Sequence, residues 1–283
     1  METVCAGKQW DVLFVEENGQ IKGAMPFLYG KKWGLKYILQ PQLTPWSGPW
    51  LQSTLDFEGR QAVLEKLAEA LRKQKTSMCL QCFSPEITDW QPFRWLGFRQ
   101  TTHYTYQFPS LSDVDGLYRS ASRLRRRYDK EVDEQCVIDE HLTLGEFVPF
   151  HIAYYRRRGE RDQVPEALIR KVVSTACDRH QGMLWGLRRR EDNALMAAWF
   201  VAYDKHCSWS LLLAIAEEAP KGAMSYLIWQ MLRRLSTLTQ SFDFEGGMDK
   251  NLAFFYRSFG TVQTPYHCVY HTRSPLLNRL LHV

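Results

Sequence analysis

Phe242-Asp-Phe-Glu-Gly246, followed by Phe255-Tyr-Arg-Ser-Phe-Gly260, is the stretch of this 283-residue sequence that most constrains the fold. Aromatic residues alternate with Asp243 and Glu245, which predicts a strand over 241–245 with both acids on one face. The pattern then predicts a short helix over 250–258, ended near Gly260, and a last strand over 263–271.

Working outward, the second half of the chain alternates between helical and strand periods. An amphipathic helix is predicted over 223–238, preceded by a three-strand meander at 183–189, 195–203 and 206–214. Two helices are predicted at 144–158 and 165–180, after a short strand at 135–139. A basic helix over 113–133 comes before them. This order predicts a mixed sheet with flanking helices, an α+β fold.

The first half repeats the end of the second. Asn18-Gly19 predicts a hairpin between strands at 10–16 and 21–29. A third strand at 36–40, a helix at 60–73, a strand at 77–83, a short helix at 90–96 and a strand at 98–108 follow. Phe93-Arg-Trp-Leu-Gly-Phe98 precedes Phe255-Tyr-Arg-Ser-Phe-Gly260 by 255 − 93 = 162 residues, and the preceding helix and strand share that offset. We therefore expect a duplication.

Composition excludes several classes of protein. Hydrophobic residues make up 45% and charged residues 24%, with a net charge of +5, as in a soluble globular protein. No apolar run approaches the roughly 20 residues that span a bilayer. The start of the chain lacks the features of a signal peptide, and seven scattered Cys suggest reduced thiols. We expect a cytoplasmic protein without integral membrane association or a disulfide scaffold.

Common catalytic and metal motifs are absent from the sequence. Cys79 and Cys82 are three apart in a predicted strand, which places them on opposite faces and unsuits them for one metal or one disulfide. Neither HExxH, GxSxG, a P-loop nor GxGxxG occurs. We therefore predict no metal site, no nucleotide hydrolysis and no serine hydrolase chemistry.

Three segments resemble the GNAT acyltransferases, and two such units in tandem resemble the FemAB (peptidoglycan-bridge aminoacyltransferase) branch. The segments are Ser122–Lys130, Lys221–Trp229, and Phe242–Gly246 with Phe255–Gly260. The resemblance implies a truncated acceptor-side unit at 1–109, a basic linker helix at 110–134 and a complete donor-side unit at 135–283. The first half lacks the opening strand and two helices, and the second lacks the long helical hairpin of several tRNA-using members.

GNAT chemistry needs an anion-binding helix start for the acyl donor, which the resemblance implies is acyl-CoA or an aminoacyl-tRNA. Lys221, Gly222 and Ala223 begin the helix over 223–238, where small residues and the helix dipole favour a phosphate. An ordinary helix start after Pro220 is the alternative, and two acids just upstream oppose a phosphate. Acids at the matching helix start of the first half repel phosphate, which leaves the donor to the second half.

Glu245, with Asp243 beside it, is the predicted catalytic group that accepts a proton from the acceptor amine or anchors that amine. A cap or salt bridge at a strand end is the alternative. Arg257 on the next helix is a candidate clamp for a phosphate or carboxylate of the donor. The alternative for Arg257 is an exposed surface residue.

Two further segments are candidate substrate sites. The predicted linker helix carries six cations, among them Arg126, and could bind tRNA, a nucleotide-linked precursor or an anionic membrane face. The alternative is a solvated helix paired with its own acids. The loop 40–50 offers Gln40, Gln42 and Trp46 to a sugar or peptide acceptor, or packs on its own aromatics.

The sequence favours an N-acyltransferase or aminoacyltransferase that moves a group from CoA or tRNA to an amine such as a cell-wall precursor. Its partners would be the acyl donor and the amine acceptor, with tRNA as a candidate; the oligomeric state is not specified. The competing hypothesis is a non-catalytic binding protein that holds an anionic partner through its cleft and Arg-rich helix. CoA-dependent acetylation of a small amine is a third.

Overall fold

The computed structural model describes residues 1–5, 7–32, 34–159 and 164–272. The chain divides into two compact units, a first unit of Met1–Tyr104 with the segment from Pro265 onward, and a second unit of Thr105–Thr264. The predicted linker segment 110–134 is thus part of the second unit, and most of the last strand belongs to the first. The part of the predicted donor unit beyond residue 272 lies outside the described residues.

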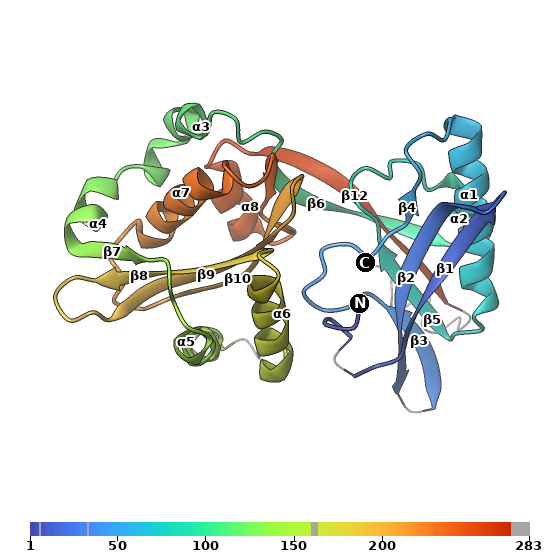
Figure 1. Cartoon of the computed structure of the whole chain (residues 1–283), viewed down its shortest axis with the longest axis horizontal. Coiled ribbons are helices and arrows are strands. Elements are labelled where there is room, and N and C mark those ends of the chain that lie inside the picture. Colours follow the sequence, from blue (N-terminus) through green and yellow to red (C-terminus); the bar gives the residue numbers. More distant parts are fainter. Residues whose placement is uncertain (6, 33, 160–163, 273–283) are drawn as a thin grey trace. The chain divides into compact units, whose positions relative to one another are not determined.

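The first unit is a twisted sheet covered by one long helix. Its elements are β1 (Trp10–Glu17), β2 (Gln20–Lys32), β3 (Leu35–Leu39), β4 (Trp50–Leu51), α1 (Phe57–Lys73), β5 (Met78–Cys82), α2 (Gln91–Trp95) and β6 (Arg99–Phe108), which continues into the second unit. The strand order is β1-β2-β3-β5-β12, and β4 pairs with β2. Helix α1 contacts β1 and β2 (Figure 1).

Local chemistry explains the boundaries of the first unit. Asn18 and Gly19 have φ angles of 52° and 72°, the conformation that the predicted two-residue hairpin requires. The Asp56 side chain accepts from the Gly59 amide at 2.8 Å, so the start of α1 is satisfied by its own acid as expected. Val63, Leu67 and Leu71 of α1 face a core shared with the sheet. Among described residues 1–56 no α-helix precedes α1, and the truncation of this unit stays a prediction.

The second unit has helices on both faces of a mostly antiparallel sheet. Its elements are α3 (Val114–Ser120), the 3₁₀ turn η1 (Arg123–Arg125), α4 (Asp129–Gln135), β7 (Cys136–Asp139), α5 (Leu144–Arg157), α6 (Glu166–Asp178), β8 (Gly182–Arg189), β9 (Leu195–Tyr203), β10 (Cys207–Ile215), α7 (Ala223–Leu235), β11 (Ser241–Asp243), α8 (Lys250–Arg257) and β12 (Val262–Thr272), whose end lies in the first unit. Figure 1 shows α7 on one face and α5 and α6 on the other.

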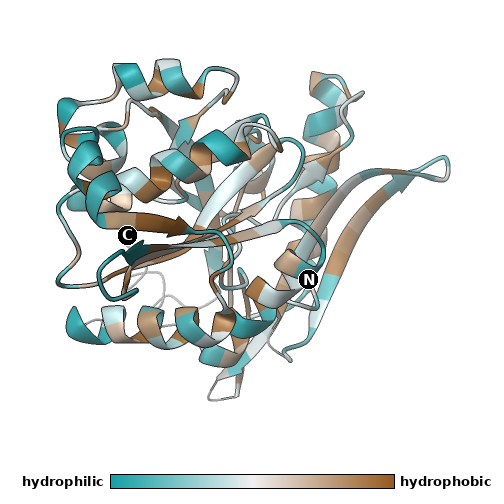
Figure 2. Cartoon of the chain, turned by 60° about the vertical axis from the view of Figure 1, so that its left-hand side comes forward, coloured by the Kyte–Doolittle hydropathy of each residue, from teal (hydrophilic) through white to brown (hydrophobic). Residues whose placement is uncertain are grey.

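Helix α7 is the centre of the second core. Its side chains are buried almost all round, including Trp229 and Met231, and they pack with Trp199 and Phe242 of the sheet. The helices at the edges of Figure 2 carry both teal and brown residues, as amphipathic helices do. Each unit therefore has its own apolar core, which stabilises that unit.

The element positions agree with the predicted offset of 162. Adding 162 to Met78 of β5 gives 240, beside Ser241 of β11, and adding it to Arg99 of β6 gives 261, beside Val262 of β12. In the same way, helix α1 of the first half corresponds to α7 of the second, and helix α2 corresponds to α8. The repeated order of helix, strand, helix and strand is thus confirmed at the level of secondary structure.

Two sequence expectations are wrong in the structure. The helix predicted over 113–133 is three short pieces, because Ala121 and Ser122 are extended and the Ser122 amide donates to the Ser258 carbonyl instead. The expectation of seven reduced thiols fails because Cys82 and Cys268 form a disulfide. They lie opposite each other in the β5–β12 ladder, 186 residues apart in sequence.

Candidate functional site

Strands β10 and β11 of the second unit begin together and then separate. They pair in parallel from Cys207 opposite Ser241 to Trp209 opposite Asp243. There β11 ends, whereas β10 continues to Ile215 and has an irregular register with β9 between Ser210 and Leu212. Bulges commonly re-aim side chains beside functional sites, and ligands of open sheets gather where neighbouring strands part.

A pocket of about 280 Å³ lies at this point of separation. Its walls come from β10, the segment after β11, and the helices α5 and α8. The side chains that matter for its chemistry are Tyr154, Tyr155, Arg158, Ser210, Glu245 and Tyr256.

Glu245 supplies the acidic group of this pocket. Its backbone is left-handed, with φ of 56°, and its amide donates to Asp243 Oδ1 at 2.6 Å. Burial, reinforced by the charge of Asp243, raises the pKa of Glu245 to about 8. A carboxyl with a pKa near neutrality can exchange a proton with a reacting group at physiological pH.

Asp243 is buried and fully engaged. Its carboxylate accepts from Thr105 Oγ1, from Gln107 Nε2 at 2.6 Å and from the Glu245 amide. Burial raises the pKa of Asp243, and these hydrogen bonds oppose that rise. The expectation that Asp243 and Glu245 share one strand face is wrong, because β11 ends at Asp243. Asp243 holds Glu245 in place and does not line the pocket.

The start of α7 differs from the predicted anion site. The Ala223 amide donates to the Pro220 carbonyl at 3.0 Å, so it is not the unpaired donor that the sequence suggested. Gly222 is the N-cap with φ of 88°, and a Cβ placed there would lie 2.8 Å from Tyr128 Cβ. Arg125 donates to Ser225 Oγ at 3.2 Å. Lys221 is exposed, and its binding of an anion stays a prediction.

The basic segment before α4 turns part of its charge inward. Arg125 lies over the Phe255 ring at 4.5 Å and Arg126 over the Tyr118 ring at 5.6 Å. Arg126 is half-buried, whereas Arg123 and Arg127 are exposed. Arg257 of α8 is exposed as well. The predicted positive field therefore has fewer outward charges than the sequence suggests, and substrate roles for Arg126 and Arg257 stay predictions.

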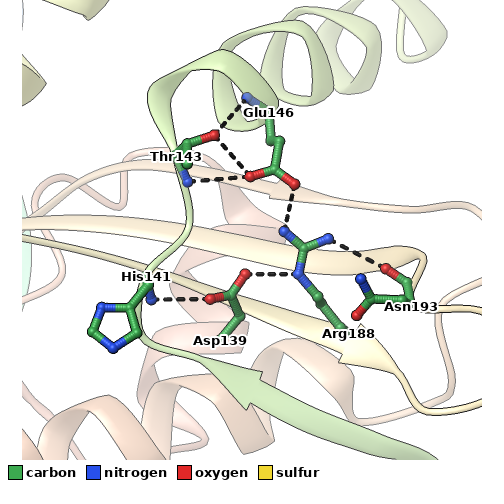
Figure 3. Close-up of polar contacts among 6 residues, drawn as sticks. All are labelled: Asp139, His141, Thr143, Glu146, Arg188 and Asn193. Carbon is green, nitrogen blue, oxygen red and sulfur yellow. Dashed lines mark hydrogen bonds and ion pairs between the residues drawn. The ribbon is translucent and has the colours of Figure 1, made fainter.

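An ion-pair network anchors the start of α5 (Figure 3). Arg188 on β8 pairs with Asp139 and with Glu146, each at 2.6 Å, and its side chain is 14% exposed. Thr143 caps α5 and exchanges hydrogen bonds with Glu146. The hydrogen bond from Thr143 and, to a smaller extent, that from Arg188 lower the pKa of Glu146. The other end of α5 carries Tyr154 and its neighbours in the pocket.

The first unit has its own pocket, of about 550 Å³, around the loop 41–50. Trp46, Trp50 and Arg60 are among its walls. Gln40 is not: its Nε2 donates to the Thr44 and Pro45 carbonyls and its Oε1 accepts from the Cys82 amide. Gln40 therefore braces the loop through these hydrogen bonds, and its predicted substrate role stays a prediction. Gln42 is exposed and outside the pocket walls.

Sequence reasoning named Trp46 of the first-unit pocket, but it missed the tyrosines of the second-unit pocket and the cations of both. Tyr154, Tyr155 and Arg158 come from the end of α5, and Arg60 from the first turns of α1. The run Tyr154-Tyr155-Arg156-Arg157-Arg158 at a helix end was a usable signal. The sequence does not show which side chains of this run line the pocket.

Within the described ranges, no cluster of three or more His, Cys, Asp or Glu side chains could hold a metal ion. In the same ranges, every helix is too short or too polar to cross a membrane.

Comparison with known proteins identifies the fold. No family model and no curated protein sequence matches the chain. Among solved structures, FemX is similar with a TM-score of 0.71 at 12% identity, over 97% of this chain and 90% of that one. The L-PGS of Bacillus licheniformis has a TM-score of 0.61 at 12% identity, over 98% and 88%. A tandem GNAT protein from the clavulanic acid biosynthesis pathway has 0.61 at 12%, over 95% and 85%. The chain has the tandem GNAT fold of these structures.

Proposed function

We propose that the chain is an N-acyltransferase or aminoacyltransferase and that the reaction takes place in the pocket where β10 and β11 part. One observation carries this proposal, namely Glu245, whose carboxyl lies in that pocket with its pKa raised to about 8. A carboxyl with this pKa can accept a proton from an amine without being permanently charged. The tandem GNAT fold of FemX and its neighbours supports acyl transfer as the reaction class.

The proposed reaction is direct attack of an amine on an acyl donor. A C–N bond forms, and the C–S bond of a thioester or the C–O bond of an ester breaks. The proton released by the amine passes to the Glu245 carboxylate, and from there to the leaving group or to solvent. Asp243 keeps Glu245 in its left-handed conformation through the 2.6 Å hydrogen bond from the Glu245 amide. Tyr154, Tyr155 and Tyr256 exclude water and position the reactants.

The donor of this proposal is an acyl-CoA or an aminoacyl-tRNA. The exposed cations Lys221 and Arg257 would contact its phosphates. Arg126 and its exposed neighbours would contact tRNA if that is the carrier. Both donors are found in the cytoplasm, which is the location we propose.

The acceptor would be a sugar- or peptide-bearing amine such as a cell-wall precursor. The pocket of the first unit supports this part, because Trp46 and Trp50 offer flat apolar surfaces and Arg60 a cation. We call it the acceptor pocket.

A binding protein without catalysis is the second candidate. It is favoured by the start of α7, where the Ala223 amide is already paired and Tyr128 and Arg125 cover the approach. On this hypothesis the exposed Arg123 and Arg127 hold an anionic partner, and binding falls steeply with salt.

Donor binding and transfer separate the two candidates. Purified protein is titrated with acetyl-CoA, longer acyl-CoAs and charged tRNA, and the melting temperature is followed, since a ligand of the native state raises it. Transfer to a panel of amines is then measured for wild type, Glu245→Gln and the exposed control Glu217→Gln. We expect donor binding by all three and a loss of transfer of about 10²-fold or more in Glu245→Gln alone. Unchanged transfer in that variant, or no shift with any donor, would overturn the proposal.

A further inference from the structure

The loop 41–50 of the acceptor pocket is held by hydrogen bonds to and near the backbone of Cys82. The Cys82 amide donates to Gln40 Oε1 at 3.1 Å, and the Cys82 carbonyl accepts from the Ser47 amide at 3.2 Å. Gln40 in turn holds the carbonyls of Thr44 and Pro45. One residue of β5 thus supports the loop at both of its halves.

The same residue is the disulfide partner of Cys268. In the β5–β12 ladder the register runs from Cys82 opposite Cys268 to Met78 opposite Thr272, so the disulfide lies at the loop end of the paired residues. Tyr266, two residues before Cys268, packs against Trp46 with ring centroids 5.8 Å apart. The bond therefore joins the two strands that touch the loop, one through its backbone and one through an aromatic ring.

The two cysteines of the disulfide differ in their exposure to solvent. Cys82 is partly exposed, whereas Cys268 is 1% exposed. The neighbouring Cys79 is 3% exposed and carries a free thiol, and burial raises its pKa far above the range where a thiolate forms. Of the two bonded cysteines, Cys82 is therefore the more exposed one for an external thiol to attack, and the buried Cys79 thiol does not compete.

We propose that Cys82–Cys268 is a thiol–disulfide exchange site that controls the acceptor pocket: the closed bond holds the loop 41–50 in place, and its opening by a cellular dithiol loosens the loop. The name acceptor pocket rests on the proposed function, but the inference itself concerns the loop and the bond. By reciprocity, a molecule that fills the ordered pocket makes the bond harder to reduce.

The exchange is balanced. A thiolate of the dithiol attacks Cys82 Sγ, forms a mixed disulfide and expels Cys268 as a thiolate. The second thiolate of the dithiol then attacks its own sulfur in the mixed disulfide and expels Cys82. Two electrons pass to the cysteine pair, the dithiol becomes a disulfide, and its two protons restore two thiols.

Thiol counting and hydrogen exchange test the inference. Denatured, unreduced protein should show five thiols, matching the five free cysteines, and seven after treatment with a water-soluble phosphine. Reduction of the native protein should accelerate amide exchange in 41–50, Ser47 above all, by about 10-fold or more. Peptides covering β8–β10 in the second unit should not change and serve as the internal control.

Variants keep the inference falsifiable. Cys82→Ser should exchange like the reduced protein and Cys79→Ser like the oxidised one; if Cys82→Ser does not fold, phosphine-reduced wild type gives the same state. Seven thiols without reductant, or unchanged exchange in 41–50 after verified reduction, would overturn the inference. Neither readout uses acyl donors, so failure here is distinguishable from failure of the transferase proposal.

Discussion

Replacing Glu245 with glutamine should change how stability depends on pH. Folding raises the pKa of this carboxyl from an ordinary 4.5 to about 8, so the folded protein keeps a proton that the unfolded chain has lost. A group with a raised pKa contributes stability below its unfolded pKa, and that contribution disappears as pH rises through the folded pKa. Wild type should therefore lose stability between pH 4.5 and 8 relative to Glu245→Gln, whose amide does not titrate.

The size of the effect follows from the same two values. The difference, 8 − 4.5 = 3.5, corresponds to at most about 4.8 kcal/mol at about 1.36 kcal/mol for each pKa unit. Glu245 is only half-buried, so solvent screening reduces this figure, and we expect about 2 kcal/mol.

Urea denaturation of both proteins between about pH 5 and pH 9 measures the difference in the free energy of unfolding. The exposed Glu217→Gln serves as the control and should track wild type. A difference between wild type and Glu245→Gln that stays flat over this range would refute the reasoning, because it would mean that the carboxyl is fully hydrated in the folded protein.

Three other perturbations have defined outcomes. Arg188→Met should destabilise the second unit by about 3 kcal/mol in urea unfolding, because Asp139, 19% exposed, loses its cation; an unchanged midpoint would contradict this. Gly222→Ala should cost clearly more than Gly246→Ala, for which we expect about 1 kcal/mol. Both glycines have positive φ, but of the two only Gly222 has a neighbour that a Cβ would meet, Tyr128 at 2.8 Å. Equal losses of stability in the two variants would contradict this close approach. Opening Cys82–Cys268 should lower stability by up to about 5 kcal/mol, as a loop of 186 residues implies, and calorimetry with and without reductant would detect no change if the bond were absent.

Elements with a strong local signal were predictable from the sequence. The hairpin at Asn18-Gly19 and strand β9 were found because turn chemistry and hydrophobic period are encoded in neighbouring residues. The prediction for Glu245, which stays untested, rests on a local pattern, an acid at a predicted strand end before two glycines.

Features set by distant contacts were not predictable. The helical pattern over 113–133 is interrupted because the Ser122 amide bonds to Ser258, 136 residues away. Cys82 and Cys268 meet only because β5 and β12 pair, and spacing alone could not show that. The Ala223 amide donates to the Pro220 carbonyl in a turn that the helical period does not reveal.

The conformation of Glu245 is the strongest argument that its side chain is there for a purpose. Glu245, Gly246 and Gly247 have φ angles of 56°, 80° and 135°, so the chain leaves the sheet through three left-handed residues. Glycine suits such positions, and a residue with a Cβ costs roughly 1–2 kcal/mol there. A carboxyl that is also desolvated adds a second cost at neutral pH. The hydrogen bond from the Glu245 amide to Asp243 holds the strained residue in position, and strain of this kind concentrates where a side chain must be presented to a ligand.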